Sequence, residues 1–199
     1  MKFWSALTGR SQPRRPDLDA LFAVPSASIG LEAAGFRPAG VGTVCFRAGS
    51  GAAAAQVEDE IRRMLDDDPD VPDDVVFTTD DFGYTWLVVR RDLGSADGPA
   101  DVAGLVTELH AVNTTLEKAG FDTGLLCTML PFTGVGGERF GLVYLYKQGT
   151  FYPFAPRPGG GQTRDTLLEL RVRDLVAGEV PVEPDQQRWL ALWDAPGLT

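Results

Sequence analysis

Cysteine and histidine are scarce in this sequence. The 199 residues include two cysteines, Cys45 and Cys127, and one histidine, His110. Two cysteines cannot build a disulfide framework, and neither belongs to a CxxC pair or lies near the histidine in sequence, which disfavours a zinc site. We therefore expect a reduced, cytoplasmic protein that holds no metal and no cofactor.

Long apolar runs and an excess of positive charge are also absent. The longest mainly apolar run, 124–132, is well short of the roughly 20 residues that a membrane-spanning helix needs. The net charge of −10 argues against nonspecific nucleic-acid binding, which rests on many Lys and Arg contacts to phosphates. Residues 1–16 differ from the rest, because they carry +4 and leave −14 for residues 17–199.

Known catalytic and nucleotide-binding motifs are missing. Neither GxGxxG nor a phosphate-binding GxxxxGK[ST] loop occurs. His110 lies beside the apolar stripe of a predicted helix, which favours a helix-to-sheet contact over a catalytic base, and both cysteines lie in predicted apolar strands. The acidic segment 66–70 resembles the start of a calcium loop, but its sixth and twelfth positions would be Val71 and Phe77, so we expect a solvated turn. The sequence predicts no enzyme.

Apolar periodicity predicts the order of helices and strands. We expect two short helices over 16–36 with Ser26 as the second cap, a strand at 41–48, and helices at 52–65 and 101–120. Further strands are predicted within 75–91 and at 125–132 and 139–147. The last helices are expected to begin at a Thr163 cap and after Pro184. This order favours a single α+β domain over 17–199, with a mostly antiparallel sheet of four to five strands packed against helices, and a helical carboxy-terminal tail.

The first 16 residues form a basic aromatic head that is predicted to be flexible or amphipathic. Its apolar side chains fall on one side of a short helix, while its arginines are of the kind that attracts anionic lipid. The candidate membrane or partner contact consists of Phe3, Trp4, Leu7, Arg10, Arg14 and Arg15. Packing of the head on the protein's own surface is the alternative interpretation.

Aromatic residues near the carboxyl end form a second candidate surface. Residues 142–147 alternate as the second strand of a hairpin, and the aromatic segment after Gly149 is predicted to be an extended edge braced by prolines. Its rings either fold under the sheet, which we favour, or face a partner. The two tryptophans of the last predicted helix either cover an edge of the core, which we favour, or face a partner. The candidate partner surface comprises Phe151, Tyr152, Phe154, Trp189 and Trp193.

Several segments together resemble the PspA-associated protein family PspAB. They are MKFWSALTGR, LDALFAVPSA, GYTWLVVRR, LHAVNTTLE, LVYLYKQGTFYPFAP and VEPDQQRWLALWDAPG, of which YKQGTFYPFAP is the most specific. The resemblance covers nearly the whole chain and brings no catalytic residue with it. It implies association with PspA, a coiled-coil, membrane-remodelling protein of the phage-shock envelope stress response at the inner face of the cytoplasmic membrane.

The resemblance therefore implies a nonenzymatic accessory protein that contacts a PspA-like coiled coil at the membrane surface. A looser likeness in element order links the chain to type III secretion chaperones and YbjN-like domains. The alternative function is a dimeric chaperone-like or peptide-binding module. Peripheral contact with anionic membrane and a homodimer are compatible with either interpretation.

Overall fold

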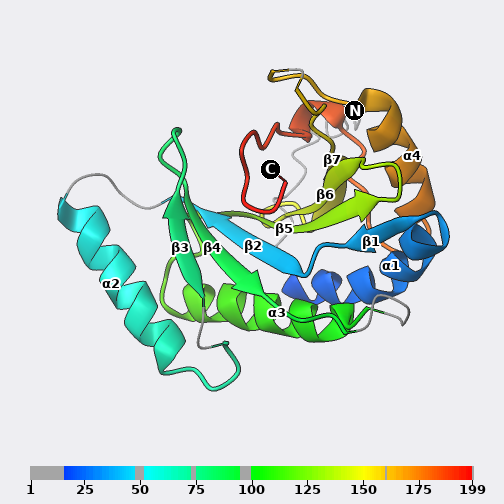
Figure 1. Ribbon diagram of the computed structural model, residues 1–199. Helices are drawn as coiled ribbons and strands as arrows, with labels where there is room; N and C mark the ends of the chain where they lie inside the picture. Colours follow the sequence, from blue (N-terminus) through cyan, green and yellow to red (C-terminus); the bar gives the residue numbers. More distant parts are fainter. Residues whose placement is uncertain (1–15, 48–51, 73–74, 95–99, 160, 199) are drawn as a thin grey trace, which may run out of the picture.

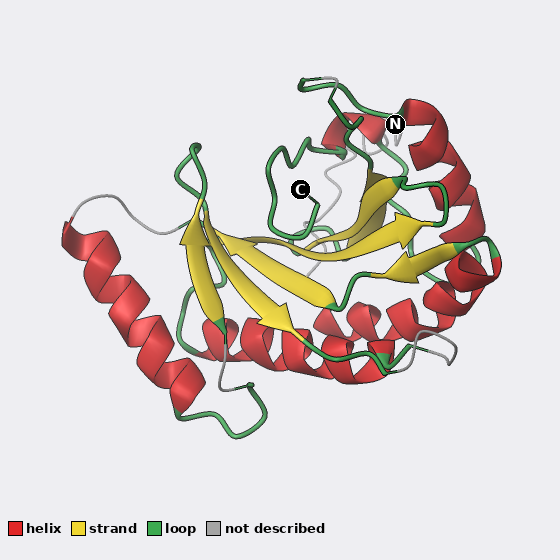
Figure 2. Ribbon diagram, in the orientation of Figure 1, coloured by secondary structure: helices red, strands yellow, loops and turns green. Residues whose placement is uncertain are grey.

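The computed structural model of the protein describes residues 16–47, 52–72, 75–94, 100–159 and 161–198. One antiparallel sheet runs through the described chain, and the helices of residues 24–33 and 102–118 cover one of its faces (Figures 1 and 2). The helices are η1 (Leu18–Ala23), α1 (Val24–Ala33), α2 (Ala52–Asp66), α3 (Val102–Lys118), α4 (Thr166–Val176) and η2 (Gln186–Arg188). The strands are β1 (Phe36–Pro38), β2 (Val41–Phe46), β3 (Val76–Thr79), β4 (Thr85–Arg90), β5 (Leu125–Gly134), β6 (Arg139–Leu145) and β7 (Thr150–Phe154).

The sheet confirms the predicted α+β class but has more strands than expected. Its order is β3-β4-β2-β5-β6-β7, and β1 pairs with the far end of β5, so seven strands replace the predicted four to five. The extra strands β1 and β7 are short and contain proline, which weakens a strand signal. Pro153 is tolerated in β7 because this strand lies at the edge of the strand order, where a backbone donor can be missing.

The main core lies between the sheet and the helices α1 and α3. The predicted stripe of α3 is buried in full and consists of Val102, Leu105, Val106, Leu109, Val112 and Leu116. Asp101 caps this helix, since its Oδ1 accepts the Gly104 N–H at 3.0 Å. The helix crosses β2 at Gly42, where an added Cβ would lie 2.4 Å from Leu109 Cδ1. Glycine is therefore required there by close packing of helix on strand.

Replacing Gly42 by alanine is expected to lower the free energy of unfolding by about 1–3 kcal/mol, because the methyl group overpacks the contact with Leu109. Urea unfolding measures the change. Gly178→Ala is the matched control, since a Cβ at Gly178 would meet no atom within 4 Å. Equal stabilities of the two variants would contradict the close approach.

The second face of the sheet is covered by the carboxy-terminal segment, which we define as residues 186–198 (Figure 1). A second core forms there from Cys45, Trp86, Cys127, Met129, Val143, Leu145, Tyr152, Phe154, Trp189, Ala195 and Leu198. The central strands are thus apolar on both faces because both faces are covered.

The predicted helical ends need three corrections. The prediction of a last helix after Pro184 is wrong, because helical structure there is confined to η2 and the described chain beyond it is irregular. The cap of α4 is Asp165, whose Oδ1 accepts the Leu168 N–H at 3.1 Å, and not Thr163. Ser26 caps no helix, since η1 runs directly into α1 and the Ser26 hydroxyl donates to Glu179 instead.

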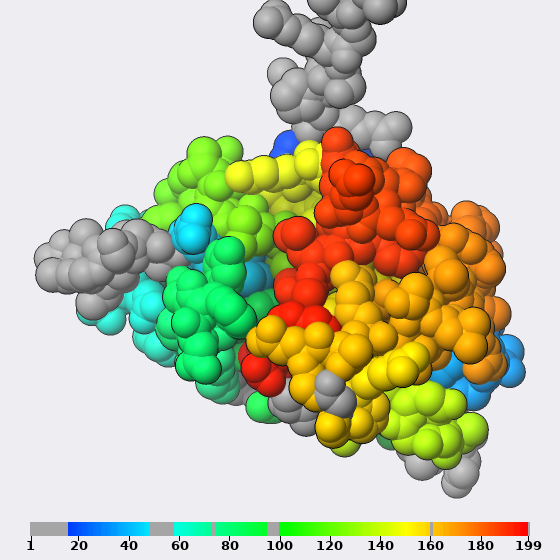
Figure 3. All heavy atoms as spheres, turned by 90° about the horizontal axis from the view of Figure 1, so that it is seen from above, coloured from blue at the N-terminus to red at the C-terminus, as the bar shows by residue number. Residues whose placement is uncertain are grey.

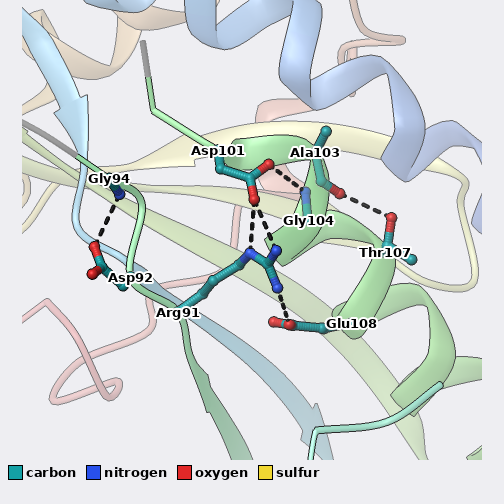
Figure 4. Close-up of polar contacts among 8 residues, drawn as sticks. All are labelled: Arg91, Asp92, Gly94, Asp101, Ala103, Gly104, Thr107 and Glu108. Atoms are coloured by element: carbon teal, nitrogen blue, oxygen red, sulfur yellow. Dashed lines mark hydrogen bonds and ion pairs between the residues drawn. The ribbon is translucent and has the colours of Figure 1, made fainter. Parts of the chain in front are cut away.

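A polar cluster fixes the link between β4 and α3 (Figure 4). Arg91 donates to Asp101 Oδ2 from Nε at 3.0 Å and from Nη2 at 2.8 Å, and it also binds Glu108. The Gly104 N–H and the Arg91 guanidinium hold the pKa of Asp101 below its ordinary value. The stabilisation that Asp101 contributes is therefore fully present at pH values above the ordinary pKa of an aspartate carboxyl. It is lost as the pH falls through the lowered pKa of Asp101. The cluster therefore holds the first turn of α3 against the end of β4.

Candidate functional site

A cavity of about 560 Å³ opens on the second face of the sheet. Figure 3 looks onto this side of the molecule, with the β3–β4 hairpin in green and the carboxy-terminal segment in red. The sheet contributes Cys45, Trp86, Cys127, Leu145 and Tyr152, while the flanks include Phe82, Tyr84 and residues 190–193. Three parts of the chain that are distant in sequence therefore build one mainly apolar cavity.

Two large apolar side chains of this cavity are exposed to solvent. Phe82, from the β3–β4 hairpin, is 57% exposed, and Leu190, from the carboxy-terminal segment, is 56% exposed. Exposed apolar groups that cluster around a concavity are typical of a surface that another molecule covers. We call Phe82, Leu190 and the cavity between them the docking cavity.

Two charged side chains at the docking cavity, Asp80 and Lys147, make hydrogen bonds within the protein. The Asp80 carboxylate accepts bonds of 2.9 Å from the backbone of Phe82 and Tyr84 and from Trp86 Nε1. Lys147 Nζ donates to the Thr123 carbonyl at 3.0 Å. These groups shape the hairpin and the edge of the cavity, and the surface left for a ligand is mainly apolar.

A buried ion pair anchors the carboxy-terminal segment to the sheet. Glu169 of α4 is 2% exposed, and its Oε1 accepts the Ala155 N–H at 2.9 Å and Arg164 Nε at 2.8 Å. Arg164 also donates from Nη1 to the Trp189 carbonyl, and its guanidinium lies 5.1 Å from the centroid of the Phe154 ring. Arg164 thus joins α4, β7 and the segment that forms one side of the docking cavity.

A second anchor covers the edge of β7. Residue Val182 forms a parallel bridge with Phe151, and the buried carboxylate of Glu183 accepts the Thr150 hydroxyl at 2.7 Å. Trp189 Nε1 in turn donates to the Glu183 carbonyl at 3.0 Å. The chain is therefore fixed both before and within the carboxy-terminal segment.

The aromatic candidates are mostly in the interior. Phe151, Tyr152, Phe154 and Trp189 are buried, whereas Trp193 is half-buried and packs edge-to-face on Phe154 with ring centroids 5.0 Å apart. The burial of these rings agrees with the favoured interpretation, but Phe151, Tyr152 and Phe154 belong to strand β7 of the sheet and do not fold under it. A partner could not contact the four buried rings directly in this structure. Tyr152 and Trp193 do line the docking cavity.

The head candidates Phe3, Trp4, Leu7, Arg10, Arg14 and Arg15 lie outside the described residues. The described chain starts beside the turn between β6 and β7, because the Asp17 carbonyl accepts the Tyr144 hydroxyl at 2.7 Å and Asp17 packs against Gly149. Lys147 and Gln148 of the same turn line the docking cavity. The first described residues therefore lie beside a turn that contributes two residues to the lining of that cavity.

The sequence predictions for His110 and the acidic segment need adjustment. His110 is half-buried but contacts η1 rather than the sheet, with Nε2 3.3 Å from Asp19 Oδ1 and its ring 4.8 Å from that of Phe22. Asp68 is not simply solvated, since its carboxylate accepts the Thr115 hydroxyl at 2.6 Å and the Asp70 N–H at 3.1 Å, which lowers its pKa. Both groups join helices to their neighbours.

Sequence reasoning missed the docking cavity and its two cysteines. Cys45 and Cys127 are buried in strands, as predicted, but the structure makes them direct partners across β2 and β5. The sequence predicted the two strands that contain the cysteines, but it could not predict that the cysteines are partners. The choice of paired strands and their register depends on the whole sheet.

A comparison with protein families agrees with the motifs quoted above. The family model described as PspA associated protein B matches residues 1–197. The chain belongs to the PspAB family. No curated protein and no solved structure gives a significant match. PspAB membership indicates an accessory role linked to PspA. No helix in the described part of this PspAB chain is long and apolar enough to cross a membrane.

Proposed function

We propose that this PspAB protein is a nonenzymatic accessory protein of a PspA-type envelope stress response, and that it binds a helix of PspA in the docking cavity. The observation that carries the proposal is the apolar cavity whose lining includes the exposed side chains of Phe82 and Leu190, in a chain whose family is named for association with PspA.

A coiled-coil helix has the chemistry that such a cavity recognises. It presents apolar side chains at i, i+3, i+4 and i+7 along one face, and these insert as anchors into an apolar groove. Phe82 and Leu190 come from two separate parts of the chain that line the cavity, and both would contact the helix. Lys147, Gln148 and Gln162 also line the cavity and can bind polar groups beside the anchors.

Action at the cytoplasmic face of the membrane is the second part of the proposal. The head carries +4 in an otherwise acidic chain, and each Lys or Arg near an anionic surface contributes about 1 kcal/mol of attraction. Because the described chain starts beside the turn whose Lys147 and Gln148 line the docking cavity, a lipid-bound head would hold this cavity close to membrane-bound PspA.

Flotation with anionic liposomes, with and without a PspA-type coiled coil, tests the proposal. The full chain is expected to float with liposomes alone, whereas a chain that begins at Pro16 is expected to float only when PspA is present. The matched control is the full chain with Arg10→Gln, Arg14→Gln and Arg15→Gln, which keeps the apolar side chains of the head but removes three charges.

Two results would contradict the proposal in different ways. Equal flotation of both chains on liposomes without PspA would show that the head does not make the lipid contact. Failure of both chains to associate with PspA, under conditions where PspA itself floats, would overturn the proposed function.

A further inference from the structure

Cys45 and Cys127 are placed for a disulfide although both are free thiols. They are direct partners in the antiparallel pair of β2 and β5. Opposed Cα atoms in such a pair lie about 4.5 or about 5.5 Å apart, and both values fall within the roughly 4.4–6.8 Å that disulfides span. The two side chains belong to the same buried cluster on the second face of the sheet. No strand needs to move far for the sulfurs to join.

The docking cavity gives a small reagent a route to these thiols. Both cysteines line it, although their exposed fractions are 2% for Cys45 and 5% for Cys127. Its volume of about 560 Å³ lies in the range of cavities that hold small molecules. A bulky protein oxidant would have to enter the same space and is excluded on size. The accessible chemistry is that of a small molecule.

We propose that Cys45 and Cys127 form a thiol–disulfide exchange site, which a low-molecular-weight disulfide entering the docking cavity oxidises to an intramolecular disulfide. This inference stands on the cysteine pair and the cavity and does not depend on PspA binding.

The exchange takes two steps. The Cys127 thiolate attacks one sulfur of the small disulfide, so that its S–S bond breaks, a mixed disulfide forms on Cys127 and one small thiolate leaves. Cys45 gives its proton to the first small thiolate, and Cys45 Sγ then attacks Cys127 Sγ, which releases the second small thiolate. The two cysteine protons end on the two small thiols, and the pair of electrons lost by the cysteines reduces the reagent.

The order of attack follows from the surroundings of the two thiols. The hydrogen bond with Cys127, and then burial, raise the pKa of the Cys45 thiol well above its ordinary value. Cys45 therefore keeps its proton, while the thiolate is the form that attacks. Cys127 is also the more exposed of the two. We assign Cys127 as the attacking thiol and Cys45 as the resolving one.

Incubation of the reduced full chain with excess hydroxyethyl disulfide, in native buffer, tests the site by intact mass and by thiol titration after unfolding. The expected product is lighter by two hydrogen atoms, has lost both thiols and is restored by dithiothreitol. Cys45→Ser should stop at a mixed disulfide on Cys127, and Cys127→Ser should keep its thiol free. Circular dichroism verifies that each variant is folded, and Cys45→Ala serves as a second variant for the resolving position.

Three results would overturn the proposal. Recovery of both thiols after exposure to the reagent would show that the pair does not react. Adducts on both cysteines without loss of two hydrogen atoms would show that they do not join. Reaction of the wild-type thiols only at the rate at which the chain unfolds, measured across increasing urea, would show that the reagent does not enter through the cavity.

Discussion

Replacing Arg164 by alanine is expected to lower the free energy of unfolding by about 3 kcal/mol. The substitution leaves the Glu169 carboxylate buried with the Ala155 N–H as its remaining hydrogen-bond donor, and it removes the donor to the Trp189 carbonyl. Loss of one partner of a buried pair is strongly destabilising because the remaining charge is uncompensated. Urea unfolding followed by circular dichroism measures the change.

Arg173→Ala is the matched control for Arg164→Ala. Arg173 lies on α4 and pairs with its neighbour Asp174, which is 68% exposed, so this substitution should change stability by less than about 1 kcal/mol. A double variant, Arg164→Met with Glu169→Leu, removes both charges and should recover part of the loss. If Arg164→Ala and Arg173→Ala were equally stable, the ion pair would not be the anchor of the carboxy-terminal segment.

Replacing Leu190 by aspartate is expected to weaken binding of the PspA-type coiled coil by at least about tenfold, which corresponds to about 1.4 kcal/mol. In the proposed complex the new carboxylate would be taken out of water at the flank of the docking cavity without a partner, which is unfavourable. The fold should tolerate the change, since Leu190 is 56% exposed in the free protein. The affinity is measured as a dissociation constant, and the stability of the variant by thermal unfolding.

The matched control for Leu190→Asp is Val135→Asp. Val135 is also an exposed apolar residue, at 93%, but it lies in the turn between β5 and β6 and does not line the docking cavity. The same charge is thus introduced at a comparable surface position away from the proposed contact. Phe82→Asp provides a second substitution in the cavity lining, in the β3–β4 hairpin, and should resemble Leu190→Asp.

The sequence predicted those parts of the fold that depend on local patterns. The stripe of α3 follows the helical period over several turns, and the strands of the β5–β6 hairpin alternate around a glycine-rich turn, so each carries its own signal. The last predicted helix failed because Trp189 and Trp193 fit a helical spacing, whereas the chain there gains more from lying irregularly over the second core. Tertiary contacts outweighed the local preference.

The docking cavity depends on contacts between distant parts of the chain, so local sequence patterns could not predict it. Trp86, Cys127 and Leu192 line one cavity although they come from β4, β5 and the carboxy-terminal segment. Their proximity follows from the strand order and from the Arg164 anchor, and neither leaves a periodic pattern in the sequence. The segment YKQGTFYPFAP, which carries the most specific family resemblance, is largely buried structure beside this cavity.

The most direct test of PspA docking is a titration of the purified PspA-type coiled coil with the full chain and with its Leu190→Asp and Val135→Asp variants. The proposal predicts that Leu190→Asp raises the dissociation constant at least about tenfold, whereas Val135→Asp leaves it unchanged within about twofold. Equal affinities of the wild type and the Leu190→Asp variant, with both folded, would contradict docking of PspA in this cavity.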